Sequence, residues 1–206
     1  MTRSFDTSDT NVVTTPGGQR VHKWHAAQSE VVRADFYEVR SGVWCLVGNG
    51  LSNQTFIEAP EGIIAVDTGE SIEEMREALR RLREFTSAPI AAVIYTHFHY
   101  VEGTKAILEE GNHAIPLPIY GHEKIAFNKE RTLGEISPAY SRGLVEQFAI
   151  VMPLEGPDAT VNVGLGFFYK NPMHAPYTPG HIPVTEVLSE KGSITVAGLA
   201  VQYQYS

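Results

Sequence analysis

The chain lacks several features that mark common classes of protein. Its single cysteine, Cys45, excludes an intramolecular disulfide, and its place in the apolar run GVWCLVG favours a buried, unreactive thiol over a nucleophile. No run approaches the roughly 20 apolar residues of a membrane span, and the first 20 residues lack the apolar stretch of a secretory signal. We therefore expect a cytoplasmic protein without a membrane partner.

Positive charge is also scarce. Lysine and arginine number 16 against 24 aspartates and glutamates, which gives a formal net charge of −8. The densest basic cluster, within residues 73–84, alternates with glutamates and favours a solvated helix face over an anion site. Without a basic stripe we expect no nucleic-acid partner. The absence of a glycine-rich phosphate loop and of a nucleophile elbow argues against a nucleotide site and a Ser-His-Asp hydrolase.

The composition that remains is that of an ordinary globular protein, with 206 residues of which 43% are hydrophobic and 19% charged. Residues 1–20 are polar and aperiodic, so we expect a flexible N-terminal arm followed by one domain over residues 21–206. Strands are predicted between residues 36 and 67, with a hairpin turn at residues 60–62. Ser71 and Glu74 form a capping-box pair, which predicts a helix beginning there. Its apolar face would consist of Ile72, Met75, Leu79 and Leu82.

The second half of the chain mixes helical and extended patterns. The nearly all-apolar run at residues 88–97 predicts a strand covered on both faces, as in a sheet layered with helices. Helices are predicted at residues 103–111 and within 123–150, and a short strand at 116–122. Proline and glycine fill residues 153–183, which indicates a long irregular excursion, and residues 192–205 predict a hairpin that turns near Gly198. The overall prediction is an α/β fold.

Two histidines, His97 and His99, follow the apolar run in the segment IYTHFHYVEGTK. Side chains two apart on a strand point to the same face, so the two imidazoles can project together. Strand ends in α/β folds open into crevices where ligands bind, and neutral imidazoles suit zinc, iron or manganese. The pair by itself is equally compatible with a metal site and with two hydrogen-bonded structural histidines.

Several motifs together resemble one known family. The segments GNGLSNQTFIEAPEGIIAVDTGES and IYTHFH resemble the metal-dependent alkylsulfatases of the metallo-β-lactamase superfamily, in the order strand pair, Asp-Thr-Gly turn, capped helix and His-x-His. The resemblance covers residues 38–125 well, and IPVTEVLSEKGSITVAGLAVQY more weakly. It implies an αββα sandwich with a metal site at one sheet edge, where zinc activates water for sulfate-ester hydrolysis. His97 and His99 match the first two histidines of the family motif, and Asp67 matches a supporting aspartate of the turn.

The sequence departs from the family's His-x-His-x-Asp-His motif directly after His99. Without a gap, Val101 stands at the aspartate and Glu102 at the third histidine; with a two-residue deletion, the Asp-His pair is absent and Glu102 replaces a glycine. Gly103-Thr104, similar to the family's Gly-Gly-Thr, favours the deletion. Under both alignments the aspartate is lost. Glu102 is thus either an oxygen ligand or an ordinary turn glutamate.

Other histidines provide further candidates. His181 in YTPGHIP is similar to the Pro-Gly-His-Thr segment that supplies a ligand in many relatives, although the strand that should follow is missing. His122 in IYGHEK matches a histidine that is generally structural in the superfamily. The family's later acidic ligands and carboxyl-terminal domains have no counterpart in residues 1–206, so we expect either a fragment of a longer protein or a short relative that has lost half the site. In both cases the sandwich would be incomplete, with exposed edge strands through which a homo-oligomer could form.

These observations lead to competing functional predictions. The first is a metal-dependent hydrolase of a small-molecule sulfate or related ester, with His97, His99 and His181 as candidate metal ligands and Asp67 and Glu102 as the acidic site residues. It would hold at most one zinc per chain, with iron or manganese as alternatives. The second is a non-catalytic binding or assembly module with a vestigial metal site. The third is a single-metal redox site completed by Glu102 or His181.

Overall fold

The computed structural model describes residues 8–205, and its central element is a seven-stranded mixed sheet in the order β3-β4-β5-β6-β7-β8-β9. The pairs from β3 to β6 are antiparallel and those from β6 to β9 are parallel. The strands are β3 (Asp35–Arg40), β4 (Val43–Val47), β5 (Gln54–Ala59), β6 (Gly62–Val66), β7 (Ile90–Ile94), β8 (Ile119–Gly121) and β9 (Glu186–Val187). A mixed sheet of this kind confirms the predicted α/β class.

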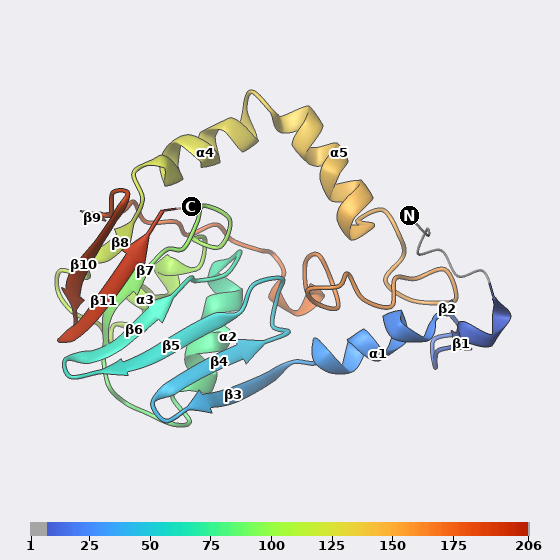
Figure 1. Cartoon of the computed structure of the whole chain (residues 1–206), viewed down its shortest axis with the longest axis horizontal. Helices are drawn as coiled ribbons and strands as arrows, with labels where there is room; N and C mark the ends of the chain where they lie inside the picture. The colour runs from blue at the N-terminus through green and yellow to red at the C-terminus, as the bar shows by residue number, and fades with distance from the viewer. Residues whose placement is uncertain (1–7, 206) are drawn as a thin grey trace.

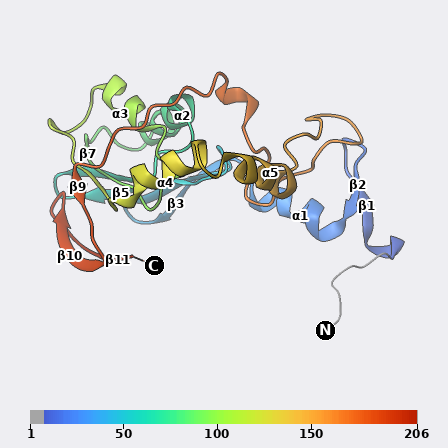
Figure 2. The same cartoon turned by 90° about the horizontal axis from the view of Figure 1, so that it is seen from above.

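Helices α2 (Ile72–Leu82) and α3 (Thr104–Glu110) cover one face of this sheet, as Figure 2 shows. The four apolar residues predicted for the face of α2 are all buried, and the main core lies between the sheet and these two helices. Ser71 caps α2 by accepting a hydrogen bond from Glu74 N at 3.1 Å. The Glu74 carboxylate accepts a hydrogen bond from Glu70 N at 3.0 Å, so it stabilises the turn before the helix.

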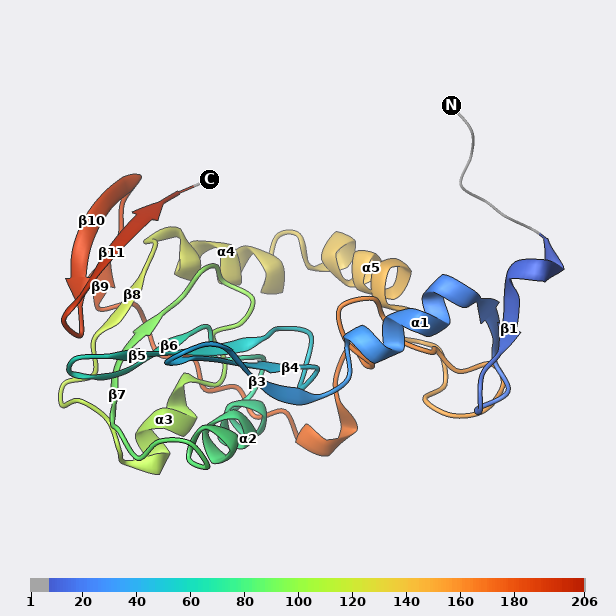
Figure 3. The same ribbon diagram turned by 60° about the horizontal axis from the view of Figure 1, so that its bottom comes forward.

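The opposite face carries a two-stranded sheet formed by β10 (Lys191–Val196) and β11 (Leu199–Gln204). Figure 3 shows this hairpin on the side of the main sheet away from α2 and α3. Its turn contains Ala197 and Gly198, both with positive φ, which confirms the turn that the sequence predicted near Gly198. Val196 joins Ile64 and Ala92 in a second, smaller core beneath the hairpin. The described residues thus form one helical layer, a full sheet and a short second sheet.

Between β8 and β9 the chain makes a long excursion that includes α4 (Lys124–Leu133), α5 (Ser137–Phe148) and the short η2 (Pro172–His174). In Figure 1, α4 and α5 run from the β8 end of the sheet toward the far end of the molecule, where α1 (Lys23–Val31) lies. Hydrogen bonds from the Asn162 amide to His25 O (2.9 Å) and Ser29 Oγ (3.0 Å) join the excursion to α1.

The predicted N-terminal arm lies partly outside the described residues. Residues 1–7 are not described, whereas residues 8–20 include η1 (Asp9–Asn11) and β1 (Val12–Thr14). Strand β1 pairs in antiparallel register with β2 (Arg20–His22), so this part of the arm forms a small hairpin that leads into α1. Within residues 8–205, no helix has both the length and the apolar character needed to cross a lipid bilayer.

Candidate functional site

Asp67 lies at the carboxyl end of β6 and supports the segment that follows β7. Its Oδ1 accepts a hydrogen bond from Thr96 N at 2.9 Å, and its Oδ2 accepts one from Thr96 Oγ1 at 2.5 Å. Its backbone has a φ of 55°, a left-handed conformation that aspartate tolerates better than most residues. Burial raises the pKa of Asp67, while the two hydrogen bonds from Thr96 and the charge of His97 oppose that rise.

The hydroxyl of Thr96 connects Asp67 to His97. It has one hydrogen, which it donates to Asp67, so it accepts from His97 Nδ1 across the 2.9 Å that separates the two atoms. We therefore assign the Nδ1–H tautomer to His97, and Nε2 retains the free lone pair. Carboxylate-supported histidines with one free ring nitrogen are the usual arrangement of a metal ligand.

His97 and His99 lie close together, but not for the reason that the sequence suggested. Strand β7 ends at Ile94, and both histidines lie in the bent segment after it, so strand alternation does not align them. Their ring centroids are nevertheless 5.1 Å apart at an interplanar angle of 71°. Tyr140 of α5 stacks on His99, with centroids 6.1 Å apart. Burial first, and then the charges of His97 and Lys129, lower the pKa of His99, which favours its neutral, ligating form.

Val101 stands in the core and not in the site. Its side chain is fully buried and packs in the main core cluster. Its backbone forms an isolated parallel bridge with Gly69, and its carbonyl accepts a hydrogen bond from Thr104 Oγ1 at 3.1 Å. The residue that takes the motif's aspartate position in the ungapped alignment is thus an apolar anchor for the start of α3.

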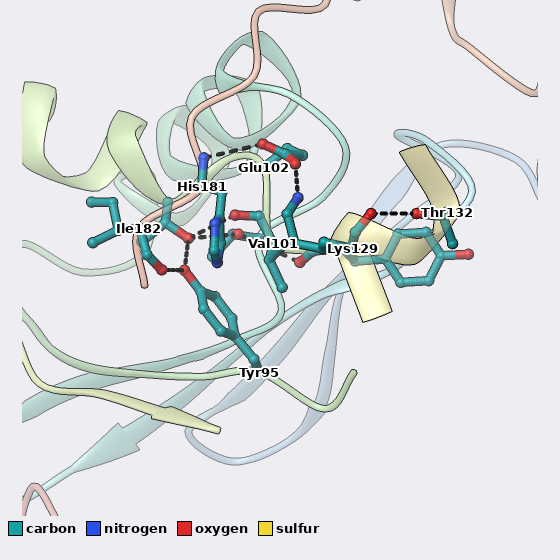
Figure 4. A network of polar contacts seen from close by, with 10 residues as sticks. Tyr95, Val101, Glu102, Lys129, Thr132, His181 and Ile182 are labelled. Atoms are coloured by element: carbon teal, nitrogen blue, oxygen red, sulfur yellow. Dashed lines mark hydrogen bonds and ion pairs between the residues drawn. The ribbon is translucent and has the colours of Figure 1, made fainter. Parts of the chain in front are cut away.

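The Glu102 carboxylate is occupied by other contacts, which Figure 4 displays. One oxygen forms an ion pair with Lys129 Nζ of α4, and the other accepts a hydrogen bond from His181 N at 3.1 Å. Its backbone N–H donates to Gly69 O at 3.0 Å. In this arrangement Glu102 joins three segments of the chain, and each carboxylate oxygen contacts a partner outside the histidine pair.

His181 lies in the irregular segment before β9, beside the ring of Tyr95. Its Nε2 is buried and has no hydrogen-bond partner. Burial and then the charge of Lys129 lower the pKa of His181, against the opposite effect of Glu102. The segment is held firmly, because Ile72 N donates to Thr178 O and Lys105 N donates to Gly180 O, both at 2.9 Å. His181 therefore retains a free ring nitrogen in a fixed position.

His122 lies on the other side of His97, in a cleft of about 390 Å³ that both histidines line. Its ring stacks on Tyr205 at a centroid distance of 4.4 Å. Its Nδ1 accepts a hydrogen bond from Lys124 N, at the first residue of α4, at 3.0 Å. This structural role agrees with the one that the sequence favoured.

The donor set does not fit a complete metal site. Among residues 8–205, no three histidine, cysteine, aspartate or glutamate side chains converge in a way that could hold a metal ion. Zinc in catalytic sites has three protein ligands and an open fourth position. His97 and His99 supply two, and Glu102 and His181 do not join them. The prediction that His181 and Glu102 share one metal site with His97 and His99 therefore stays a prediction. The positions of the four side chains in this structure do not support it.

An acidic pair next to the Asp67 turn, buried Glu74 and half-buried Glu70, was not predicted from the sequence. Burial and the neighbouring Glu74 raise the pKa of Glu70 to about 8, and burial raises the pKa of Glu74 to about 7. Gln54 Nε2 donates to Glu74 at 2.7 Å. The sequence predicts Glu74 as the capping-box partner of Ser71, and that role already accounts for a carboxylate at this position. The burial of Glu74 depends on packing against β5.

We expect Asp67→Ala to lower the free energy of unfolding by about 1–3 kcal/mol, because two donors of Thr96 lose their acceptor and alanine is strained at positive φ. Asp67→Asn is the matched control, since asparagine tolerates this φ and would donate to Thr96 Oγ1. The Thr96 hydroxyl would then donate to His97 and reverse its tautomer. Chemical denaturation and ¹⁵N NMR of the imidazole measure the two effects; an unchanged stability in Asp67→Ala would refute this role.

Known proteins resemble this chain in sequence. Residues 47–100 match the family model described as the metallo-beta-lactamase superfamily, and the match ends one residue before Val101. Over 150 residues the chain is 33% identical to a linear primary-alkylsulfatase of a Pseudomonas sp. strain, covering 71% of this chain and 27% of that protein. A second linear primary-alkylsulfatase of Pseudomonas sp. is 27% identical over 187 residues, which cover 87% of this chain and 27% of that protein.

The chain thus spans about a quarter of the length of the curated relatives that it matches. Among solved structures, the stereoselective inverting sec-alkylsulfatase from Pseudomonas sp. superposes with a TM-score of 0.68 at 19% identity, covering 94% of this chain and 34% of that chain. This likeness confirms the predicted metallo-β-lactamase-like fold, present here in part. Family model, sequence relatives and fold agree that this chain belongs to the metallo-β-lactamase superfamily, and within it resembles the alkylsulfatases.

Proposed function

We propose that this chain belongs to a hydrolase of the alkylsulfatase kind, which acts on a sulfate or related ester with the help of a metal ion. The observation that carries the proposal is the His97–His99 pair, with ring centroids 5.1 Å apart and with His97 oriented by Thr96 and Asp67. The sequence similarity to two linear primary-alkylsulfatases supports the substrate class. A small-molecule substrate, homo-oligomer formation through edge strands and a cytoplasmic location stay predictions.

The roles of the individual residues follow from their contacts. His97 Nε2 and the neutral imidazole of His99 are the two donors that the chain offers to a metal ion, and zinc is the predicted one. Asp67 acts through Thr96 and fixes the orientation of His97. Glu102 is an ion-pair partner of Lys129, and its role as an acidic site residue stays a prediction. With two ligands the site stays incomplete, so we assign no chemical step to the metal.

A non-catalytic member of the superfamily is the second candidate, and two observations favour it. Val101 is packed in the core where one alignment places the motif's aspartate. Both oxygens of Glu102 are bound to other parts of the chain. A protein with this arrangement would retain the family's fold for binding or assembly while its metal site is vestigial.

Metal content and sulfate release together separate the two candidates. We expect protein purified without a histidine tag to contain at most one zinc ion per chain, held loosely because two imidazoles leave the remaining coordination to water. The His97→Ala/His99→Ala double variant should lose this zinc and keep its circular dichroism spectrum. Elemental analysis and sulfate release from an alkyl sulfate are the measurements, with His113→Ala as a control.

For the hydrolase, sulfate release should be weak in the wild type and absent from the double variant. Equal metal content in both proteins would show that the pair is not a metal site. Two tightly held zinc ions per chain, or robust sulfate release, would show that the chain has a complete site that includes other residues.

A further inference from the structure

Lys129 lies where residues of three segments meet. Its ammonium forms an ion pair with Glu102, whose other carboxylate oxygen accepts the His181 N–H at 3.1 Å. The lysine and glutamate side chains are only 19% and 22% exposed. This low exposure separates the pair from ordinary surface salt bridges, which contribute little because water screens them. Figure 4 shows Glu102 in contact with both partners.

The charge of Lys129 also acts on two histidines. After burial, it is a cause of the lowered pKa of His181, and after burial and His97 it is a cause of the lowered pKa of His99. His181 Nε2 is buried and without a partner, so one ring nitrogen near this cation keeps a free lone pair.

Glu102 and His181 carry a carboxylate and an imidazole, two kinds of group that bind metal ions. Two imidazoles and one carboxylate are the donors of many mononuclear metal sites. Within residues 8–205 no such set of three converges, and the Glu102 carboxylate is directed at Lys129. A divalent cation near Glu102 would have to displace the ammonium and would also be repelled by it, since charges a few ångströms apart interact strongly away from bulk water.

We propose that Lys129 is an internal cation that takes the place of a metal ion beside Glu102 and His181, so that a divalent cation is kept away from these two residues. The proposal stands on the contacts of Glu102 and goes beyond the proposed hydrolase function. It gives a physical reason for the incomplete site: the carboxylate nearest the histidine pair in sequence already has a permanent positive partner.

Zinc titration of the whole chain by isothermal calorimetry tests the proposal. We expect Lys129→Met to bind zinc at least about tenfold more tightly than the wild type, because the ammonium no longer neutralises Glu102 or repels the ion. The double variant Lys129→Met/Glu102→Gln should return to the wild-type affinity. The charge-preserving Lys129→Arg should also bind as the wild type does.

Lys124→Met is the matched control, because Lys124 is exposed in the same helix and its ammonium lies over the ring of Tyr205. It should leave zinc affinity unchanged. If Lys129→Met does not fold, Lys129→Gln keeps a hydrogen-bond donor for Glu102 without the charge and should give the same increase. Thermal denaturation establishes that each variant is folded.

An unchanged zinc affinity in folded Lys129→Met and Lys129→Gln overturns the proposal, as does an equal increase in Lys124→Met. An increase that persists when Glu102 is replaced in the double variant also contradicts it. Failure of the hydrolase proposal has a different readout, namely the absence of sulfate release from an alkyl sulfate by the wild type. The two results are independent.

Discussion

Replacing Gly103 by alanine is expected to lower the free energy of unfolding by about 3 kcal/mol. Gly103 precedes α3 at the point where that helix packs against the Asp67 turn, and a Cβ atom there would overlap the carbonyl oxygen of Thr68 and the Cβ of Met75. Backbone and Cβ atoms cannot rotate away, so the two elements would have to separate. The φ of −90° is allowed for alanine, so the cost is steric.

The control for this substitution is Gly143→Ala in the interior of α5. Apart from the adjoining backbone of α5 itself, no described atom lies within 4 Å of the position that its Cβ would take. Alanine favours helix over glycine by about 0.5–1 kcal/mol. We therefore expect a small increase in stability there, against a large loss at Gly103. Urea denaturation at one pH measures both. Equal effects of the two substitutions would show that α3 and the Asp67 turn are not closely packed.

Folding stability is expected to decrease as the pH rises from 5 to 8, because of Glu70. Its pKa rises from 4.5 to about 8 through burial and the nearby Glu74. A carboxyl group whose pKa is raised by folding contributes stability that is fully present below about pH 4.5 and is lost as the pH passes through its folded value. Each pKa unit corresponds to about 1.4 kcal/mol. We therefore expect the free energy of unfolding to fall by more than about 1.4 kcal/mol between pH 5 and 8.

Glu70→Gln isolates this contribution, since it removes the ionisation and keeps the size of the side chain. The free energy of unfolding of the wild type minus that of the variant should decrease progressively as the pH rises from 5 to 8. Histidines cancel in this difference to the extent that the substitution leaves them unchanged. Exposed Glu61 in the β5–β6 turn provides the control variant Glu61→Gln. A pH-independent difference for Glu70→Gln would place that carboxyl in water.

Local signals predicted most of the fold correctly because each depends on a few neighbouring residues. Ser71 marks the start of α2 through a contact with Glu74 three residues later. The turn at Pro60 and Glu61 joins paired strands in which Ala59 lies opposite Gly62. The predicted strand at residues 88–97 was too long, since β7 ends at Ile94. The apolar pattern continues through Tyr95, whose buried ring belongs to the core and whose N–H still donates to Tyr120 O of β8 at 2.9 Å, although the strand ends at Ile94.

The site could be predicted only where it is local. His97 and His99 attract attention through their spacing, and Asp67 through its Asp-Thr-Gly turn. The contacts of Glu102 with Lys129 and His181 join residues that are far apart in sequence and different in type. Nothing in the segment FNKER distinguishes Lys129 from a solvated helix lysine. Its role depends on how α4 lies over the sheet edge, which is decided by tertiary packing.

The long excursion between β8 and β9 has a consequence for how the chain folds. Tyr120 pairs with Glu186 in parallel register, so this last pair of the sheet forms only when the ends of residues 122–185 come together. Closing so long a loop costs conformational entropy before any contact repays it. The antiparallel strands β3 to β6, which are adjacent in sequence, meet no such barrier. The sheet should thus grow from β3 toward β9, and the histidine segment should acquire its final neighbours last.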